Sequence, residues 1–309
     1  MALTLLESAK RMTGETHRQG IVEIFGQSTD LLRVLPFDVI QGNAYRYDQE
    51  GTLPGIAFRG VNESYTESTG IINPQVEHLV IAGGDVDVDK ALMKWHGAER
   101  RAEQVAMKVK ALGHTISHKL IKGDSTTDPR EVDGLQRRIT GTQLIPAGAT
   151  SGGDALSLFL LDAAIDAVAG ATHLLMSRAM RRRFTQAARN TTVGGNIQIT
   201  TDALGRQIMK YADLEILFAD ADGDLYASLG FNEANPGGGS AVGTSIYILS
   251  LGTGKMKGIH SGPPDAADLG EQNSKPVFRT RVEWYPGMVI EHPRAAARLY
   301  GVKDAAIVA

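Results

Sequence analysis

Three aspartates that alternate with valines are the residues of this chain best placed to do chemistry. Asp85, Asp87 and Asp89 are separated by Val86 and Val88, and residues two apart in an extended strand point to the same face. Clustered carboxylates can bind a divalent cation or exchange protons with a substrate. No lysine, histidine or serine motif accompanies them, so we favour a strand edge that faces solvent or another subunit.

Two histidines form a second candidate. His114 and His118 stand four residues apart, so their imidazoles could share one helix face. Zinc requires at least one further ligand, and Thr115 occupies the position of the glutamate in a metalloprotease helix. We therefore predict histidines at the surface or at an interface. A metal-dependent enzyme that uses the three aspartates with His114 or His118 is kept as an alternative.

Two loops resemble ligand-binding motifs but depart from them at the positions that bind the ligand. Residues 220–224 have the alternating aspartates of a calcium loop, yet its sixth and twelfth positions hold Leu225 and Phe231 instead of glycine and glutamate. Residues 252–255 resemble the end of a phosphate-binding loop, yet Met256 stands where a magnesium-binding hydroxyl is needed. We predict neither calcium nor nucleotide binding, and no cofactor.

A cluster of arginines lies on one predicted helix that Ser177 caps. Guanidinium groups match the geometry of both carboxylates and phosphates. No aromatic residues are interleaved to stack on nucleic-acid bases. We rank salt bridges between subunits first, contact with DNA phosphates second and a solvated face third. The cluster comprises Arg178, Arg181, Arg182, Arg183 and Arg189.

The composition is that of a globular protein without special chemistry. The 309 residues, 42% hydrophobic and 22% charged, suit one large domain or two modest ones. The net charge of -3 gives no global basic field that would draw the chain onto nucleic acid. The absence of cysteine excludes disulfides, thiolate metal sites and cysteine nucleophiles. No apolar run is long enough to span a membrane, and the N-terminus does not read as a signal peptide.

The first half of the chain predicts extended, thinly covered elements. A helix over residues 2–12 and an apolar-periodic stretch over 20–35, stopped by Pro36, come first. Alternation and recurrent glycines predict a long polar hairpin over about 39–80. Its arms of about 15 residues would reach roughly 50 Å at about 3.3 Å per residue, and would need a partner to cover them.

A long helix over about residues 90–122 follows the acidic strand. Its apolar residues form a single narrow stripe, so we expect it to lie along a sheet or across a surface. The stripe contains Ala98, Ala102, Val105, Val109, Leu112, Ile116 and Leu120.

The second half predicts a compact mixed region. A helix capped by Asp154 and closed by Gly170 is apolar nearly all round and should be buried. Residues 174–176 predict a buried strand, and short strands should fill 196–260 around a glycine-rich loop at 235–240. The end predicts strands over 277–284 and 288–291, then a brief helix over 293–299.

The order of these elements and several short motifs resemble the Hong Kong 97-type major capsid proteins of tailed bacteriophages. In that family the return strand of the hairpin leads into the long helix, as residues 65–89 do here. The helix ends in a Gly-Asp loop followed by Pro and then Gly-Leu, as in residues 121–135. Phe-Arg and then Pro-x-Ala follow near the end, here Phe278-Arg279 and Pro293-Arg294-Ala295.

The resemblance implies an α+β fold of four parts. These are an N-terminal arm (residues 1–40), an extended loop (41–82), a peripheral domain (83–134 and about 276–292) with a spine helix (about 90–122), and an axial domain (135–275 and about 293–309). The implied function is that of a capsid protein and not an enzyme. Hexamers and pentamers would form an icosahedral head around double-stranded DNA, assembled in the host cytoplasm and found in the virion.

The resemblance also implies partners. The chain would bind further copies of itself, with separate scaffolding and portal proteins and, as in some shells, decoration proteins, and would touch packaged DNA without sequence specificity. No membrane partner is expected. We expect contacts between subunits from charged residues of the loop, the acidic strand and the basic helix: Arg46, Arg59, Glu63, Glu67, Asp85, Asp87, Arg178, Arg181, Arg182 and Arg183.

An encapsulin-like shell of a bacterial nanocompartment would share this fold and is the second hypothesis. A cargo-binding groove in the N-terminal region would favour the compartment. Neighbouring portal and terminase genes would favour the phage head.

The extended loop leads to a prediction about covalent sealing. Some members of the family join subunits through an isopeptide bond between a lysine of this loop and an asparagine. Residues 41–82 contain no lysine, and Arg281 stands where the helper glutamate would align, although Asn273 lies near the asparagine position. We predict that assembled particles run as single chains on denaturing gels, and covalent ladders would contradict this.

Overall fold

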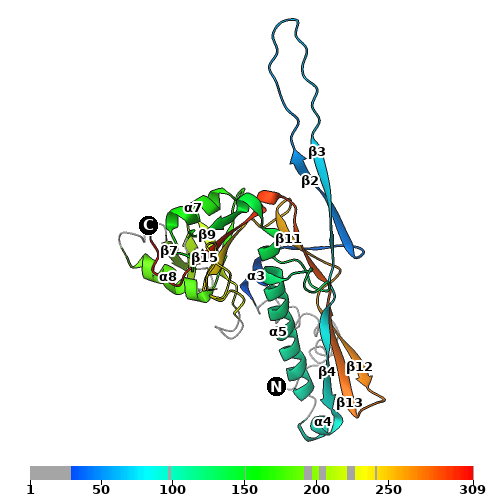
Figure 1. The fold of residues 1–309 in the computed structure, drawn as a ribbon. Helices are drawn as coiled ribbons and strands as arrows, with labels where there is room; N and C mark the ends of the chain where they lie inside the picture. Colours follow the sequence, from blue (N-terminus) through cyan, green and yellow to red (C-terminus); the bar gives the residue numbers. More distant parts are fainter. Residues whose placement is uncertain are drawn as a thin grey trace.

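A computed structural model describes residues 29–96, 99–149, 151–190, 197–201, 207–220, 227–240 and 242–308. The chain divides into a body with three sheets and a hairpin that stands out from it (Figure 1). The predicted helix over residues 2–12 lies outside the described residues. The described helices contain no segment long and apolar enough to cross a membrane.

The hairpin consists of β2 (Ala44–Thr52) and β3 (Ile71–His78), paired antiparallel with Tyr45 opposite Glu77. Its paired arms are shorter than the 15 residues predicted. The ladder has an irregularity between Glu50 and Thr52, and Pro54 and Gly55 then follow, which do not favour a continuous strand. Residues 53–70 continue beyond the ladder without further strand pairing.

The long helix packs on a three-stranded sheet of order β12-β13-β4. The strands are β12 (Asp265–Glu271), β13 (Val277–Trp284) and β4 (Ala82–Asp89). The alternation predicted for the acidic strand is confirmed, since Asp85 and Asp87 are exposed and Val88 is buried. The sequence predicts that the C-terminal part of the peripheral domain begins at about residue 276. The same sheet also contains β12, which begins earlier, at Asp265.

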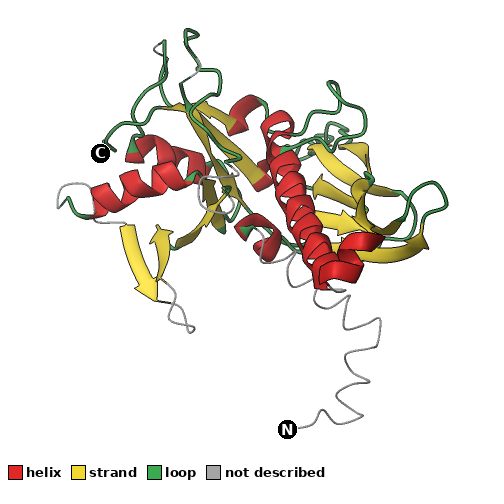
Figure 2. Cartoon of the chain, turned by 90° about the horizontal axis from the view of Figure 1, so that it is seen from below, coloured by secondary structure: helices red, strands yellow, loops and turns green. Residues whose placement is uncertain are grey.

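The long helix is present as two segments, α4 (Lys90–His96) and α5 (Glu99–Lys122). Its stripe is buried at Val109, Leu112, Ile116 and Leu120, but Ala102 is exposed. Towards its C-terminal end the helix is covered more widely than a narrow stripe requires, because Gly113, His114 and Ser117 are buried too. The two sheets that flank α5 are visible from below in Figure 2.

The largest sheet has seven strands in the order β5-β15-β10-β6-β9-β8-β7. The helices α7 (Leu158–Asp166) and α8 (Arg178–Ala188) accompany it. The strands are β5 (Leu144–Pro146), β15 (Ala296–Val302), β10 (Thr244–Leu249), β6 (His173–Met176), β9 (Leu214–Phe218), β8 (Gln207–Tyr211) and β7 (Ile197–Thr201).

A small third sheet joins the hairpin to the rest. It contains β1 (Phe37–Val39), β11 (Met256–His260) and β14 (Pro286–Ile290), with β11 in the centre. The short segments α3 (Asp30–Val34), α6 (Leu135–Arg138), η1 (Gly141–Gln143) and η3 (Pro293–Ala295) complete the described chain.

Two predicted elements of the second half are wrong in part. The brief helix over 293–299 is only the turn η3, after which β15 begins at Ala296, because this segment pairs with β10 on one side and β5 on the other. Helix α7 begins at Leu158, since Asp154 forms an isolated bridge with Val302 instead of capping the helix. That helix is not buried all round, because Phe159 is 75% exposed.

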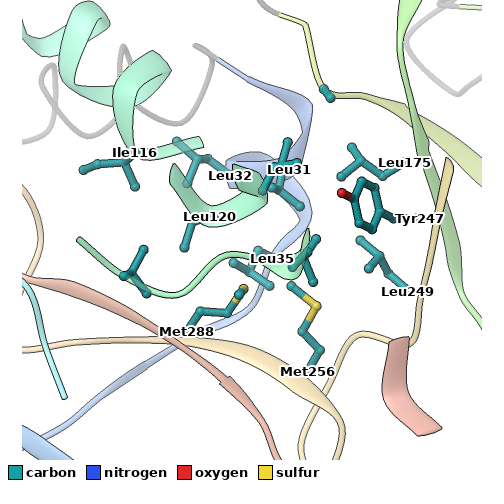
Figure 3. Close-up of a cluster of buried hydrophobic side chains, with 14 of the residues drawn as sticks. Leu31, Leu32, Leu35, Ile116, Leu120, Leu175, Tyr247, Leu249, Met256 and Met288 are labelled. Carbon is teal, nitrogen blue, oxygen red and sulfur yellow. The ribbon is translucent and has the colours of Figure 1, made fainter. Parts of the chain in front are cut away.

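The core lies where α3, α5, the seven-stranded sheet and β14 meet. Figure 3 shows apolar side chains from these elements pointing toward one another, among them Leu31, Leu120, Tyr247 and Met288. A second cluster packs α7 and α8 on the seven-stranded sheet. Between the two, the buried carboxylate of Glu233 contacts Arg298 of β15 at 3.0 Å and Lys122, the last residue of α5, at 3.2 Å. This charged contact ties the end of the long helix to the large sheet.

Candidate assembly site

The outer part of the hairpin exposes large apolar side chains. Ile56 is 92% exposed and Phe58 is fully exposed, and the segment that carries them stands away from the described body (Figure 1). Single exposed apolar residues are normal in soluble proteins, but a group of large ones on one projecting segment indicates an interaction site. The exposed apolar residues of the hairpin are Leu53, Ile56, Phe58, Val61, Tyr65, Ile71, Ile72 and Val76. We call residues 53–70 the tip.

The charged candidates on the hairpin organise the tip locally. The backbone N–H of Gly60 donates to the Glu63 carboxylate at 2.8 Å, and Arg59 donates to the Glu63 carbonyl at 3.2 Å. The Arg59 guanidinium also lies over the Tyr65 ring, 5.2 Å from its centroid. Arg46 and Glu67 are exposed and make no ion pair within the described part of the chain, so their charges are available to a partner.

The acidic strand is paired inside its own sheet. Asp87 accepts two hydrogen bonds of 2.7 Å from Arg279, and Asp85 accepts bonds of 2.8 and 3.2 Å from Arg281. The sequence pointed to the aspartates but not to these partners, because the partners lie almost 200 residues away. The four side chains form a charged ladder on the face of the sheet that is turned away from α5. Both arginines could still contact a second subunit.

The arginine ladder shifts the acidity of these carboxylates. Hydrogen bonds from Arg281 and Arg279 lower the pKa of Asp85 and Asp87 respectively below the ordinary aspartate value. On the opposite face, the hydrogen bonds from Arg101 of α5 lower the pKa of Asp268. Arg101 also donates to Thr280 of β13 at 2.7 Å, so it holds the long helix to the sheet.

The basic helix α8 is capped as predicted, since the Ser177 side chain accepts from the Met180 N–H. Several of its arginines are engaged within the chain. Arg178 and Arg181 lie over the Phe218 ring at 5.8 and 5.4 Å, and Arg183 pairs with Asp304 at 2.7 Å. Arg182 on the same helix is exposed, and so is Arg189, the residue that follows the helix.

The enzyme-like motifs gain no support from the geometry. His114 is buried, which makes the prediction of a surface histidine wrong for this residue, and burial lowers the pKa of the half-buried His118. Residues 252–255 form a turn between two strands, with no helix after the lysine. Asp220 is buried and accepts hydrogen bonds from the backbone N–H groups of Arg178, Ser228 and Leu229. Across the described ranges, no three His, Asp or Glu side chains are grouped as metal ligands.

Two exposed aromatic residues were missed by sequence reasoning. Trp95 on α4 is 73% exposed and Phe159 on α7 is 75% exposed. Large aromatic side chains dominate the energetics of protein interfaces. The local sequence does not distinguish these two aromatic residues from buried core residues, because both lie in helices among other apolar side chains.

The arrangement of these elements matches a fold that is found in solved structures of other proteins. No family model and no curated protein matches the sequence. Solved structures do match. The holo-SrpI encapsulin complex from Synechococcus elongatus is 15% identical, with a TM-score of 0.67, over 100% of this chain and 99% of that chain. The chain has the Hong Kong 97-type capsid fold. A structure from Mycobacterium phage Bobi is 12% identical, with a TM-score of 0.61, over 88% of this chain and 90% of that chain.

The matching structures thus include a phage protein, an encapsulin complex and a virus-like particle. A virus-like particle from Pyrococcus furiosus is 11% identical, with a TM-score of 0.54, over 92% of this chain and 98% of that chain. The fold expected from the order of the sequence motifs is confirmed, and every residue of the hairpin tip is exposed.

The lowered pKa values predict how stability depends on acid. Asp85, Asp87 and Asp268 bind fewer protons in the folded chain than in the unfolded chain, so their contribution is present above the unfolded pKa of about 3.9 and is lost as the pH falls through the folded values. We expect the urea concentration at which half of the subunit is unfolded to decrease as the pH drops below about 4. The variant D85N/D87N/D268N should show a shallower fall.

A triple control, D48N/D166N/D213N, removes three carboxylates that pair with no arginine in the described ranges. It should keep the acid dependence of the wild type. An equally steep fall in D85N/D87N/D268N would show that the arginine contacts do not set this dependence.

Proposed function

We propose that this chain is a shell-forming subunit, the major capsid protein of a tailed-phage head. One observation carries the proposal: the hairpin tip exposes large apolar side chains, and it stands away from the described body (Figure 1). Burying one such side chain contributes about 1.5–3 kcal/mol. Another copy is a suitable cover, because closed symmetric association presents the same surface to every neighbour.

In this proposal the parts of the fold have separate tasks. The hairpin would lie over a neighbouring subunit, and the sheet β12-β13-β4 with its helix would form the peripheral domain. The seven-stranded sheet with α7 and α8 would form the axial domain and meet its copies around five- and six-fold axes. Rings of five and six would close the shell, and scaffolding, portal and DNA contacts would follow from that role.

An encapsulin-like compartment is the second candidate. It is supported by the match to the SrpI encapsulin complex, which covers the whole of this chain. Particles purified from the native source distinguish the two roles. Double-stranded DNA inside them supports a phage head, and an enclosed protein cargo supports a compartment.

A metal-dependent enzyme is not favoured. Asp85 and Asp87 each use both carboxylate oxygens to accept hydrogen bonds from an arginine. A cation at this place would have to compete with a guanidinium group. Metal analysis of the purified protein tests this directly, and stoichiometric zinc or manganese would revive the enzyme hypothesis.

The proposal predicts that the hairpin tip is needed for assembly but not for folding. We expect the variant I56S/F58S/V61S to keep the wild-type thermal midpoint, because these side chains are almost entirely exposed in the subunit. Its yield of large particles in sedimentation velocity should fall at least tenfold, since the apolar contact is lost.

The control T66S/T69S changes exposed polar residues of the same tip. It should assemble as the wild type does. Normal particle yield from I56S/F58S/V61S would overturn the role given to the tip.

A further inference from the structure

Within the described residues the hairpin touches the body at its base alone, so its direction depends on few contacts. The chain on either side is anchored by backbone hydrogen bonds, from Ile40 N–H to the His260 carbonyl and from Val80 N–H to the Pro286 carbonyl, both at 2.9 Å. These bonds fix where the hairpin starts. They do not fix the tilt of the two-stranded ribbon above that point.

The first side-chain contact at the base holds β2. The Tyr45 hydroxyl donates to Glu291 at 2.8 Å and accepts from the Lys257 ammonium at 3.1 Å. Lys257 also lies 2.8 Å from Glu291 and 2.9 Å from Asp38, and it sits over the Tyr45 ring at 4.8 Å. The lysine side chain is only 6% exposed, so little water competes for these bonds.

The carboxylate in this group is well held. Its second oxygen accepts from the Gly254 N–H at 2.6 Å. Burial alone would raise the pKa of Glu291, but the hydrogen bonds from Lys257 and Tyr45 outweigh it and lower the pKa below the ordinary value. The anchor for Tyr45 is therefore an ion pair that stays charged in neutral solution.

The second contact holds β3. Arg138 of α6 donates through both terminal nitrogens to the two oxygens of Glu77, one of them at 2.6 Å. Arg138 is itself fixed, because its Nε donates to the Asp133 carbonyl at 2.7 Å. A bidentate pair of this kind sets orientation as well as distance.

The two contacts grip opposite strands at the same level. Tyr45 and Glu77 are direct partners in the β2–β3 register, and residues directly opposite in an antiparallel pair point to the same face. One anchor alone would leave the ribbon free to pivot about that strand. Two anchors on the same face of opposite strands, together with the backbone hydrogen bonds of Ile40 and Val80 below them, restrict both the tilt and the roll.

We propose that Tyr45 and Glu77 are positioning residues that set the angle at which the extended hairpin leaves the body. The lever is long: the 17 residues from Tyr45 to Val61 reach about 50 Å, so a rotation of about 10° at the base moves the tip by roughly 9 Å. If the proposed function holds, such a displacement would carry the apolar tip away from its place on a neighbouring subunit.

The variant Y45F/E77Q tests the proposal by changing the two positioning residues on the hairpin and leaving their partners on the body unchanged. It removes the Tyr45 hydroxyl and the charge of Glu77, so the bidentate ion pair with Arg138 is reduced to one neutral acceptor, the new amide oxygen. Lys257, Glu291 and Asp38 stay paired with one another, and Arg138 keeps its hydrogen bond to the Asp133 carbonyl. The matched control is Y65F/E67Q, which makes the same chemical changes at the tip, where neither polar group bonds to a described part of the body. Both variants should keep the wild-type urea midpoint.

The angle can be measured directly, because the chain has no cysteine. Spin labels on T66C at the tip and A163C on the exposed face of α7 report the distance from tip to body in the unassembled subunit by double electron–electron resonance. We expect the wild type and Y65F/E67Q to give one narrow distribution. Y45F/E77Q should give a distribution at least twice as wide, and Y45F alone an intermediate width.

A distance distribution in Y45F/E77Q as narrow as that of the wild type would overturn the proposal. If the double variant does not fold, the same measurement on Y45F alone decides. Assembly is a separate readout. If the wild type assembles into shells, Y45F/E77Q should assemble into particles whose diameters, measured by electron microscopy, vary more widely. If the wild type forms no shells, the proposed function fails, while the distance measurement still decides whether the two residues position the hairpin.

Discussion

The apolar surface of this chain is distributed unevenly, and a single chain cannot bury all of it. The body buries its apolar side chains in two clusters, one around α5 and one under α7 and α8. The hairpin cannot do the same, because a two-stranded ribbon has no third layer to cover it. Its apolar side chains at Ile56, Phe58 and Val61 remain in solvent. In the proposed function, association with another copy would supply the missing layer.

Ion pairs in this chain serve mainly to orient elements. Arg101 holds α5 to the sheet, Glu233 joins the end of α5 to β15, and Tyr45 and Glu77 hold the hairpin. Exposed pairs contribute little to stability. Pairs that are partly buried and bidentate restrict geometry, which would matter if the hairpin meets another copy at a defined place, as in the proposed function. The near-neutral net charge conceals this local organisation.

Much of the fold followed from periodicity and order, and the failures have physical causes. The two-residue period of β4 and the apolar stripe of α5 predicted those elements and their buried faces. The segment after Pro293 has the composition of a helix, yet it becomes β15 because two strands pair with it. Local propensity loses to such tertiary pairing. The partners of Asp85, Tyr45 and Glu77 were not predictable, because they come from distant segments that only the fold brings together.

Electron microscopy of the purified wild-type chain tests the central claim most directly. Negatively stained samples, prepared alone and with any scaffolding protein encoded beside it, should show closed shells or rings of five and six subunits. A chain that stays monomeric or dimeric under all of these conditions would contradict the account, because the apolar hairpin would then be exposed without a partner.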